Sequence, residues 1–442
     1  YVLTPKLGTS FIFSAVGVLA MVSLMLSYFD LFLKRLEFKL IDRALITLGI
    51  VVLLIAGLGA LVVLGLKGIP TRQLSIIFPW IREENVIFVS VAEHHPPSWD
   101  QLFLSLNITF LFIPFSVLLI FLKYRRKETF LVLIPAIGAI YGTSSAAYLM
   151  NLAGPLASIM AAIGLGELLK TMGRELSKRE PRKGRKFKRY VRIDPIPIMG
   201  VILVIVIVAS ATIANSARSG DQIPTILASG IPYKVVNKAW IKALEYLREN
   251  VSSNAVVVAW WDYGYWITVV GNKTSLCDNA TINGTQISIV GRALLSDELT
   301  AAKIMIEQLK TPINNTYVMA YEAFYVQGDR MVLLGVADVA KSYWMIRIGG
   351  LNVSEYFDLS RGVVRWDAEK PRSALLYKVI MNSALAVAKS QGWIPNFPIV
   401  EEPTIFYPQY IAAEESRGII VVVGIYKLNA TAFQQMVLKS SS

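Results

Sequence analysis

The sequence is poor in the residues that build disulfides and metal-thiolate sites. Its 442 residues include one cysteine, Cys277, and two histidines, His94 and His95. One cysteine excludes an internal disulfide, and two adjacent histidines are poorly arranged to bind a single metal ion. The chain also has no glycine-rich phosphate loop, and residues 1–216 contain no Asp-X-Asp triplet. A globular domain in this chain must therefore rely on its hydrophobic core.

Long apolar runs are abundant, and the chain is too apolar for an ordinary soluble protein. Hydrophobic residues make up 54% of it, and the mean hydropathy is +0.52. Six stretches are long enough to span a bilayer, at about 11–33, 44–66, 104–122, 129–150, 152–169 and 196–216. No comparable run follows Ser216. We therefore expect a transmembrane domain over 1–216 and a globular domain over 217–442.

Basic residues concentrate in alternate loops between these stretches. They cluster at 34–43, at 123–127 and most densely at 170–192. Because Lys and Arg accumulate in cytoplasmic loops, the basic loop 170–192 is expected in the cytoplasm, and the loop 67–103 and residues 217–442 outside it. The net charge of +13 then reflects membrane topology, and no nucleic-acid partner is expected.

Helical and strand-like patterns alternate after residue 216, which favours an α/β domain. Apolar spacing predicts an amphipathic helix over 234–249 and a short buried strand over 255–259. The other expected elements are a mostly helical segment over 287–310, a strand over 317–320, a helix over 373–389 and a strand over 418–427.

The most informative segment, directly after the predicted strand 255–259, is Trp260-Trp261-Asp262-Tyr263-Gly264. At average residue usage this pentapeptide arises on the order of once in ten million positions or fewer. Two indole N–H donors beside one carboxylate suit a small hydroxyl, which can donate to Asp262 while accepting from an indole. Aromatic clusters at strand ends more often serve packing, but packing does not require this combination.

The pentapeptide resembles the signature of the catalytic subunit of oligosaccharyltransferase, the membrane enzyme that moves a lipid-linked glycan onto the Asn of Asn-X-Ser/Thr. The resemblance implies that Trp260, Trp261 and Asp262 hold the Ser or Thr hydroxyl at position +2 from the acceptor Asn, with Tyr263 and Gly264 as supporting residues. It also implies a polytopic α-helical membrane domain, whose six stretches look like the family's last six spans, followed by an extracytoplasmic α/β globular domain.

A second motif follows downstream. Asp338, Lys341 and Met345 are spaced i, i+3 and i+7 within 332–346, a segment that can be helical, so they would share one face. Taken alone, such a pair of Asp and Lys is most simply a surface ion pair. Its place in the chain resembles the family's D-x-x-K-x-x-x-M/I motif, which implies that Lys341 and Met345 complete the pocket, with Met345 meeting a Thr methyl and Asp338 in support.

The external loop carries the candidate catalytic acid, in Ser90-Val91-Ala92-Glu93. This segment resembles the family's S-V-S-E motif, with Ala92 replacing the second Ser. Without the resemblance, Glu93 is simply a solvated carboxylate. With it, Glu93 is expected to be catalytic and to be one ligand of a divalent Mg or Mn ion, whose other ligands would come from a missing N-terminal half of the same protein. Such an ion neutralises the leaving phosphate.

Asn-X-Ser/Thr triplets are frequent after residue 216, so the globular domain is itself expected to be glycosylated. The candidate sites are Asn250, Asn272, Asn279, Asn283, Asn314, Asn352 and Asn429. Asn279 and Asn283 resemble the family's own glycosylated sites.

The resemblance implies N-glycosylation by en bloc transfer of an oligosaccharide from a lipid-phosphate carrier, with this chain supplying the sequon pocket and one catalytic acid of a glycosyltransferase. The expected partners are a dolichol-linked oligosaccharide, an acceptor polypeptide, the membrane, the missing N-terminal half and accessory subunits. The expected location is the cell membrane, with 217–442 outside an archaeal cell or in a eukaryotic lumen. The alternatives are a non-catalytic acceptor-recognition module or inactive paralogue, and an unrelated transporter, which the scarcity of charges within the spans disfavours.

Overall fold

The computed structural model divides the chain into two compact units, Tyr1–Ile81 and Arg82–Ser442. It describes residues 85–124, 127–177, 195–220 and 223–441, with scattered positions between 25 and 76. In the first unit, residues 28–35 are helical. Most of the predicted spans 11–33 and 44–66, and most of the basic loop 170–192, lie outside the described residues.

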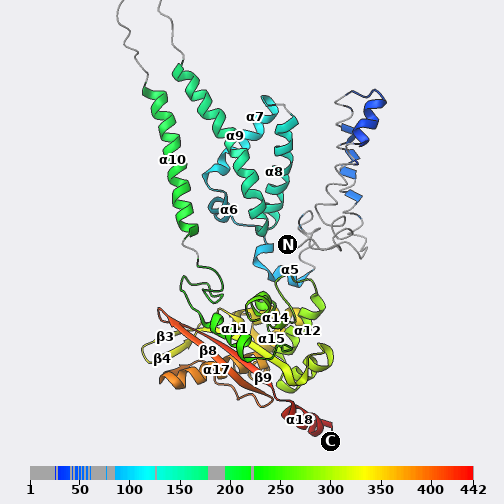
Figure 1. The fold of residues 1–442 in the computed structure, drawn as a ribbon, viewed down its shortest axis with the longest axis vertical. Helices are drawn as coiled ribbons and strands as arrows, with labels where there is room; N and C mark the ends of the chain where they lie inside the picture. The colour runs from blue at the N-terminus through cyan, green and yellow to red at the C-terminus, as the bar shows by residue number, and fades with distance from the viewer. Residues whose placement is uncertain are drawn as a thin grey trace, which may run out of the picture. The chain divides into compact units, whose positions relative to one another are not determined.

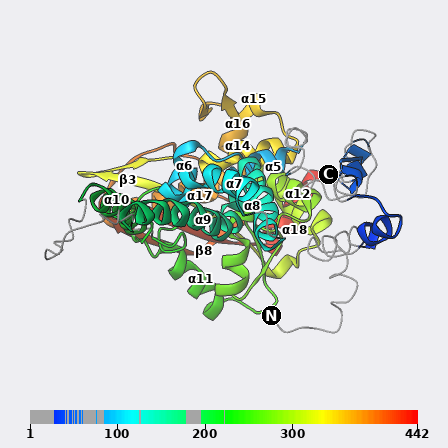
Figure 2. The same cartoon turned by 90° about the horizontal axis from the view of Figure 1, so that it is seen from above.

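The apolar part of the second unit is helical. Helices α7 (Ile113–Leu122), α8 (Lys127–Ser145) and α9 (Met150–Ser177) pack against one another (Figure 1), and α10 (Pro195–Gly220) contacts α9 (Figure 2). Within the described residues, Ala147–Arg174 and Met199–Ala217 are long and apolar enough to cross a membrane. Apolar helical segments are thus confirmed, whereas the number of spans remains a prediction.

The run 104–122, which is predicted to be long enough to span a bilayer, is not one straight helix. Helix α6 (Trp99–Leu106) ends before Asn107, which has a φ of 62°, and 3-10 helix η3 (Ile108–Phe112) leads into α7. The chain bends by 96° between the two helical segments. The side chain of Asn107 accepts a hydrogen bond from Ile108 N at 2.6 Å, which satisfies a backbone group freed by the break.

The globular domain is built on a mixed sheet with the order β2-β1-β3-β4-β7, in which β9 pairs with both β3 and β8. β1 is parallel to β2 and β3, whereas β3, β9 and β8 run antiparallel. The strands are β1 (Val256–Val258), β2 (Thr274–Ser275), β3 (Thr316–Gln327), β4 (Arg330–Leu333), β7 (Ile394–Asn396), β8 (Phe406–Ser416) and β9 (Ile419–Leu428). β3 is the central strand because it pairs with β1, β4 and β9.

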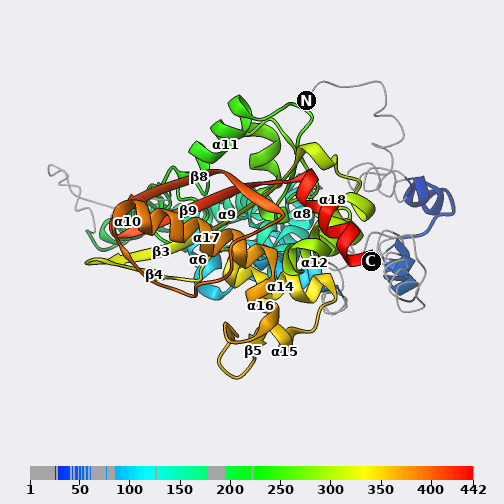
Figure 3. The same ribbon diagram turned by 90° about the horizontal axis from the view of Figure 1, so that it is seen from below.

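Helices cover this sheet. α11 (Ala239–Asn250) packs against β8 and β9, and α17 (Leu375–Gln391) packs along β3 and β9 (Figure 3). α12 (Gly284–Leu295) lies against α14 (Asp338–Gly349). Further helical elements include α13 (Glu298–Lys303), η7 (Ile304–Gln308), η8 (Ile313–Asn315), α15 (Val353–Tyr356), α16 (Glu369–Ser373) and α18 (Ala430–Ser441). The predicted α/β character of this domain agrees with the mixed sheet and its helical cover.

Several predicted boundaries need correction. The helix predicted over 234–249 begins only at Ala239, because the side chain of buried Asn237 accepts a hydrogen bond from Ala239 N at 3.0 Å. The helical segment predicted over 287–310 breaks before Asp297, whose side chain accepts from Thr300 N and starts α13. The segment 332–346 is not continuously helical, since Leu333 ends β4 and α14 begins at Asp338.

Candidate functional site

The WWDYG segment leaves the carboxyl end of β1, as the sequence predicted. Trp260 is extended, Trp261–Tyr263 form the 3-10 helix η5, and the chain continues into the π-helix η6 (Trp266–Val270). β1 lies parallel to β3, so the segment sits where α/β sheets commonly place their ligand sites.

Gly264 allows two backbone segments to approach each other closely. A Cβ atom at this position would lie 2.2 Å from the carbonyl oxygen of Cys277 and 2.5 Å from the Cα of Asp278. Gly264 has an ordinary helical φ of −55°, so space and not backbone conformation requires glycine here. Because the obstructing atoms are backbone, they cannot move aside as a flexible side chain would.

We predict that Gly264→Ala lowers the free energy of unfolding by about 2 kcal/mol or more, as overpacking at rigid contacts does. Thermal unfolding followed by circular dichroism in detergent measures it. Gly154→Ala is the matched control, because a Cβ at Gly154 in α9 meets nothing within 4 Å. Equal melting temperatures for the two variants would contradict the assigned contact.

Asp262 forms an ion pair with Lys341 of α14, with 2.6 Å between Oδ2 and Nζ. The two side chains are 21% and 27% exposed, respectively, so the pair is partly shielded from water but still reachable. The two motifs are 79 positions apart in sequence, and the fold brings them into direct contact.

Tyr263 and Asp338 form the buried base of this pair. The Tyr263 hydroxyl donates to Asp338 Oδ1 at 2.5 Å and accepts from Lys341 Nζ at 2.8 Å. Asp338 Oδ2 accepts from Tyr321 N at 2.9 Å. Burial raises the pKa of Asp338 to about 6, an effect that Lys341 and the hydrogen bond from Tyr263 oppose. Lys341 therefore lies between two carboxylates and a phenol, which fixes its position.

Packing of aromatic rings holds the base in place. The ring of Tyr263 lies 4.7 Å from that of Trp240 and 5.2 Å from that of Tyr321, measured between ring centres. Burial raises the pKa of Tyr263 well above its ordinary value, so this residue stays a neutral phenol. Sequence reasoning treated Tyr263 only as support for the motif, whereas it connects Asp338 to Lys341.

The indoles and Met345 are more deeply buried than their predicted roles suggest. Trp260 is 2% exposed, Trp261 8% and Met345 0%. The Trp260 ring lies 3.3 Å from where a Cβ would stand at Gly291 in α12, and so fills the space left by that glycine. Among the described residues, Trp261 Nε1 is a buried donor without a hydrogen-bond partner. Direct contact of Trp260 and Met345 with a ligand therefore stays a prediction.

Glu93 lies in the 3-10 helix η2 (Ala92–His94) and is exposed. Next to it, His94 is 7% exposed and packs edge-on against Phe88 and Tyr148, with 5.5 Å between ring centres in each pair. His95 accepts a backbone hydrogen bond from Ala147 at 3.0 Å. The loop is thereby tied to the start of η4 (Ala147–Leu149), at the beginning of the apolar helix.

The other end of the Glu93 loop packs against the globular domain. It is formed by α5 (Val86–Ser90), of which Val86 and Ile87, followed by Val91, pack against the core that contains the signature. Ile87 Cδ1 lies 3.1 Å from where a Cβ would stand at Gly284, the first residue of α12. In the described residues no hydrogen bond or ion pair joins Glu93 to Asp262 or Lys341.

The described part of the chain does not form a complete metal site. Within it, no group of three or more His, Cys, Asp or Glu side chains is placed to hold a metal ion. Glu93 thus offers only one exposed carboxylate to a metal ion. One carboxylate by itself does not fit a bound Mg or Mn ion, which requires several oxygen ligands. Cys277 is buried, and burial raises the pKa of its thiol to about 12, so it is no thiolate ligand at neutral pH.

The candidate glycosylation sites lie at the surface of the globular domain, and Asn429 is only half-buried. Asn283 caps α12 by accepting from Gln286 N at 3.1 Å, and Asn352 caps α15 by accepting from Ser354 N at 3.2 Å. In the triplet at Asn314, the hydroxyl-bearing Thr316 is completely buried and donates to Pro312 O. Whether each of these Asn residues carries a glycan stays a prediction.

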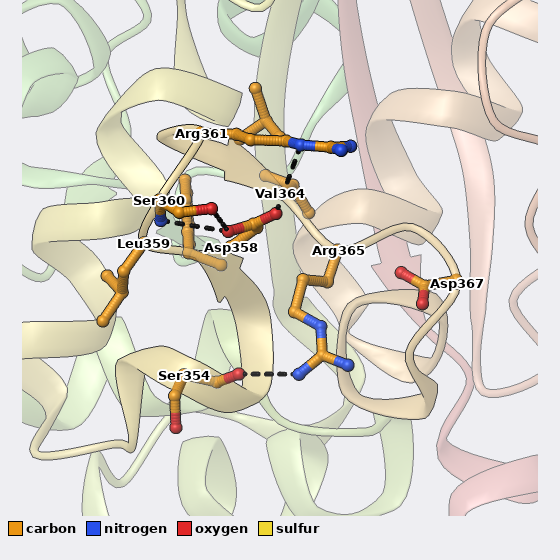
Figure 4. A pocket seen from close by; sticks show the side chains of 10 residues that line it. Ser354, Asp358, Leu359, Ser360, Arg361, Val364, Arg365 and Asp367 are labelled. Carbon is orange, nitrogen blue, oxygen red and sulfur yellow. Dashed lines mark hydrogen bonds and ion pairs between the residues drawn. The ribbon is translucent and has the colours of Figure 1, made fainter.

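A separate cavity of about 700 Å³ lies beside α15 and the hairpin of β5 (Phe357–Asp358) and β6 (Val363–Val364), shown in Figure 4. There Arg365 donates to Ser354 O at 3.1 Å, and Ser360 donates to Asp358 at 2.6 Å. None of its lining residues belongs to the WWDYG segment or to the face of α14 that bears Lys341.

Sequence reasoning missed Glu322, in the centre of β3. Its carboxylate is completely buried, in the run Thr316–Gln327 that is otherwise almost wholly apolar. A single Glu within an apolar strand was the signal that could have identified it, because Glu is almost never fully buried unless its charge is paired.

The comparisons with known proteins agree with the motifs. Residues 253–330 match the family model described as the STT3/PglB/AglB core domain. The chain is 26% identical over 316 residues to the Dictyostelium discoideum dolichyl-diphosphooligosaccharide–protein glycosyltransferase subunit STT3, with 70% of this chain and 42% of that protein covered. With the Saccharomyces cerevisiae STT3 subunit it is 27% identical over 364 residues, covering 78% of this chain and 47% of the yeast protein.

Among solved structures, the oligosaccharyltransferase AglB from Archaeoglobus fulgidus, in complex with an inhibitory peptide and a dolichol-phosphate, superposes with a TM-score of 0.56. The match covers 91% of this chain and 48% of that one at 15% identity, and so concerns the fold. The chain spans about half the length of the curated relatives it matches. The predicted resemblance is confirmed: residues 253–330 match the STT3/PglB/AglB core domain, and the chain is similar in sequence to STT3 subunits and in fold to AglB.

Proposed function

We propose that this chain supplies the acceptor-binding part of an oligosaccharyltransferase, a glycosyltransferase that moves an oligosaccharide from a dolichol phosphate carrier to the Asn of Asn-X-Ser/Thr. The observation that carries the proposal is the partly exposed pair of Asp262 and Lys341 at the exit of β1. A hydroxyl is complementary to this pair, because it can donate to the carboxylate and accept from the ammonium group. Trp261 Nε1, which has no hydrogen-bond partner among the described residues, offers a further donor.

The proposed recognition is preorganised. Lys341 is already held by Tyr263, and Tyr263 by Asp338, so binding a hydroxyl requires little reordering of the receiving groups. Positioning of this kind lowers the entropic part of a reaction barrier. We assign the Ser or Thr at position +2 to this pocket, with Trp260 and Met345 shaping its wall from within the core.

Glu93 is the proposed catalytic residue, acting on the Asn amide. The amide nitrogen is a poor nucleophile because its lone pair is delocalised, and rotation out of conjugation costs roughly 18 to 20 kcal/mol. A carboxylate that accepts its N–H bonds favours an activated geometry. The amide nitrogen then bonds to the anomeric carbon with inversion, the bond from that carbon to the carrier's phosphate oxygen breaks, and one amide proton passes to the Glu93 carboxylate.

The packing of the Glu93 loop supports a shared acceptor site. Val91, two residues before Glu93, packs against the same core that contains Trp260 and Trp261. A sequon lying across this surface would present its Asn and its +2 hydroxyl to two segments of one packed body.

Further parts of the proposal rest on the family resemblance. They are a divalent Mg or Mn ion with Glu93 as one ligand, six spans, an extracytoplasmic globular domain, and glycosylation at Asn279, Asn283 and the other candidate Asn residues. The remaining metal ligands and accessory subunits would come from outside this chain.

Binding of two matched peptides tests the proposed pocket. We expect a fluorescent Asn-X-Thr peptide to bind the full chain in nanodiscs at least about tenfold more tightly than Asn-X-Val, because Val has the shape of Thr but offers no hydroxyl to hydrogen-bond with Asp262 and Lys341. Fluorescence anisotropy gives both dissociation constants. Equal affinities would refute hydroxyl recognition, and Thr-specific binding without glycan transfer by the complete enzyme would favour a pure acceptor-recognition module.

A further inference from the structure

Glu322 is a completely buried carboxylate surrounded by backbone N–H donors. Oε1 accepts from the backbone nitrogens of Ala323 at 2.8 Å, Val336 at 3.0 Å and Ala337 at 3.0 Å, and Oε2 accepts from Val339 N at 2.9 Å. Its exposed fraction is 0%. Every one of these partners is a donor, so the hydrogen bonds favour the charged carboxylate, whereas burial opposes the charge and raises the pKa of Glu322 to about 7.

Three of the four donors lie at the start of α14. The first N–H groups of a helix have no partner within the helix, and Ala337, at the cap position, supplies no side-chain hydrogen bond. Glu322 replaces the missing cap from a neighbouring strand. Its negative charge at the N-terminus of α14 also interacts favourably with the helix dipole.

The start of α14 is connected directly to the proposed acceptor pocket. Ala337, which donates to Glu322, accepts the backbone hydrogen bond of Lys341 at 3.0 Å. One residue before Glu322 on β3, Tyr321 N donates to Asp338 Oδ2 at 2.9 Å. Two carboxylates therefore join β3 and α14 in opposite directions, one from the strand and one from the helix.

An apolar side chain would fill this position in β3 without the cost of burying a charge. Replacing buried charged groups by well-packed apolar residues is often neutral or stabilising, so stability alone does not account for a carboxylate in the middle of the sheet. A carboxylate differs from an apolar residue in fixing the position and direction of several N–H groups at once.

We propose that Glu322 is a positioning residue for the acceptor pocket: it fixes the start of α14, and thereby the place from which Lys341 holds Asp262. The role in peptide recognition rests on the proposed function, whereas the placement of Lys341 does not. Glu322 touches no substrate, and it acts through the helix.

The test compares Glu322→Gln with Glu298→Gln in the full chain. Gln has the size of Glu, but its NH₂ group replaces the oxygen that accepts from Val339 N. Two hydrogen-bond donors then face each other, and this hydrogen bond is lost. Glu298 is a matched control, because it is 6% exposed, accepts from Thr404 N at 2.7 Å and from Ile405 N at 2.8 Å, and binds Lys378, with no contact to the pocket.

The first measurement is the rate of reductive methylation of Lys341, read by mass spectrometry. Lys341 is partly exposed but held by Asp262 and Tyr263, so it should react slowly in the wild-type protein. We expect Glu322→Gln to speed its methylation about tenfold, the change that follows the loss of one hydrogen bond to a charged group. Glu298→Gln should leave this rate unchanged, although both variants lower the melting temperature.

The second measurement is the affinity for the Asn-X-Thr peptide, expected to fall about tenfold in Glu322→Gln and to stay at the wild-type value in Glu298→Gln. A Lys341 methylation rate that is the same in both variants and the wild type would overturn the positioning role. If the wild type binds no peptide, the proposed function fails, and the methylation rates still decide the role of Glu322. If Glu322→Gln does not fold, the same comparison with Glu322→Asp decides, and a wild-type rate there would overturn the proposal.

Discussion

Asp262→Ala is expected to weaken binding of an Asn-X-Thr peptide by about 100-fold and to reduce glycan transfer at least as much. Removing one partner of a hydrogen-bonded charge pair leaves the other charge unpaired, at a cost of about 2 to 5 kcal/mol. Here the stranded group is the Lys341 ammonium, which Tyr263 alone would then hold. Anisotropy titration of the full chain measures the affinity, and transfer is measured where the wild-type protein transfers glycan.

Two further variants distinguish the loss of the proposed hydroxyl-binding pocket from the mere loss of a negative charge. Asp358→Ala makes the same change on the same domain, at a partly exposed carboxylate that pairs with Arg361, and should bind the peptide like the wild type. Asp262→Asn keeps the size and one acceptor oxygen and should fall between wild type and Asp262→Ala. Unchanged peptide affinity in Asp262→Ala would remove the hydroxyl pocket from this segment.

Elements with a strong local pattern could be predicted from the sequence. The run 255–259 precedes the signature and forms β1, and the expected strand over 418–427 corresponds to β9 (Ile419–Leu428). β8 (Phe406–Ser416) was missed because Pro408 and several polar residues interrupt its apolar pattern. Its pairing with β9 along nearly its whole length is a tertiary contact, and no local propensity reports it.

The candidate site was predictable in its members but not in its connections. Asp262, Lys341 and Asp338 follow from the two motifs, yet the hydrogen bonds that link Asp338 to Lys341 pass through Tyr263. Helical spacing placed Met345 on the same face as Lys341, but α12 packs across that part of α14 and buries Met345 completely. Periodicity identifies a face of a helix, whereas only the packed fold decides which part of that face stays open.

The position of α14 shows why the connections within the site could not be inferred from the sequence. Its start depends on a carboxylate from β3, a strand that is otherwise a continuous apolar run. Within that run a single Glu looks like an interruption, and nothing in the local sequence indicates that three of its four hydrogen-bond donors lie in the backbone of another segment. Buried polar groups that join distant elements are thus the part of this fold most weakly encoded in local sequence.

Glu93→Gln is expected to reduce glycan transfer by about 10³-fold while changing peptide affinity by less than about twofold. Removing one preorganised electrostatic group from a reacting centre typically costs 10²- to 10³-fold in rate. Gln has nearly the same volume, and Glu93 is exposed, so the free energy of unfolding should change by less than about 0.5 kcal/mol. Transfer to a labelled Asn-X-Thr peptide, anisotropy and thermal unfolding measure the three quantities.

The contrast between Glu93 and Asp262 is what makes this experiment decisive. Glu93→Gln should affect transfer and spare binding, whereas Asp262→Ala should affect both, because the proposed pocket binds the +2 hydroxyl and the acid acts on the Asn amide. Glu249→Gln in α11 is the control for loss of an exposed carboxylate, since its side chain is 64% exposed. Wild-type transfer by Glu93→Gln would exclude Glu93 as the catalytic acid, and an equal loss of peptide affinity would place it in the binding site instead.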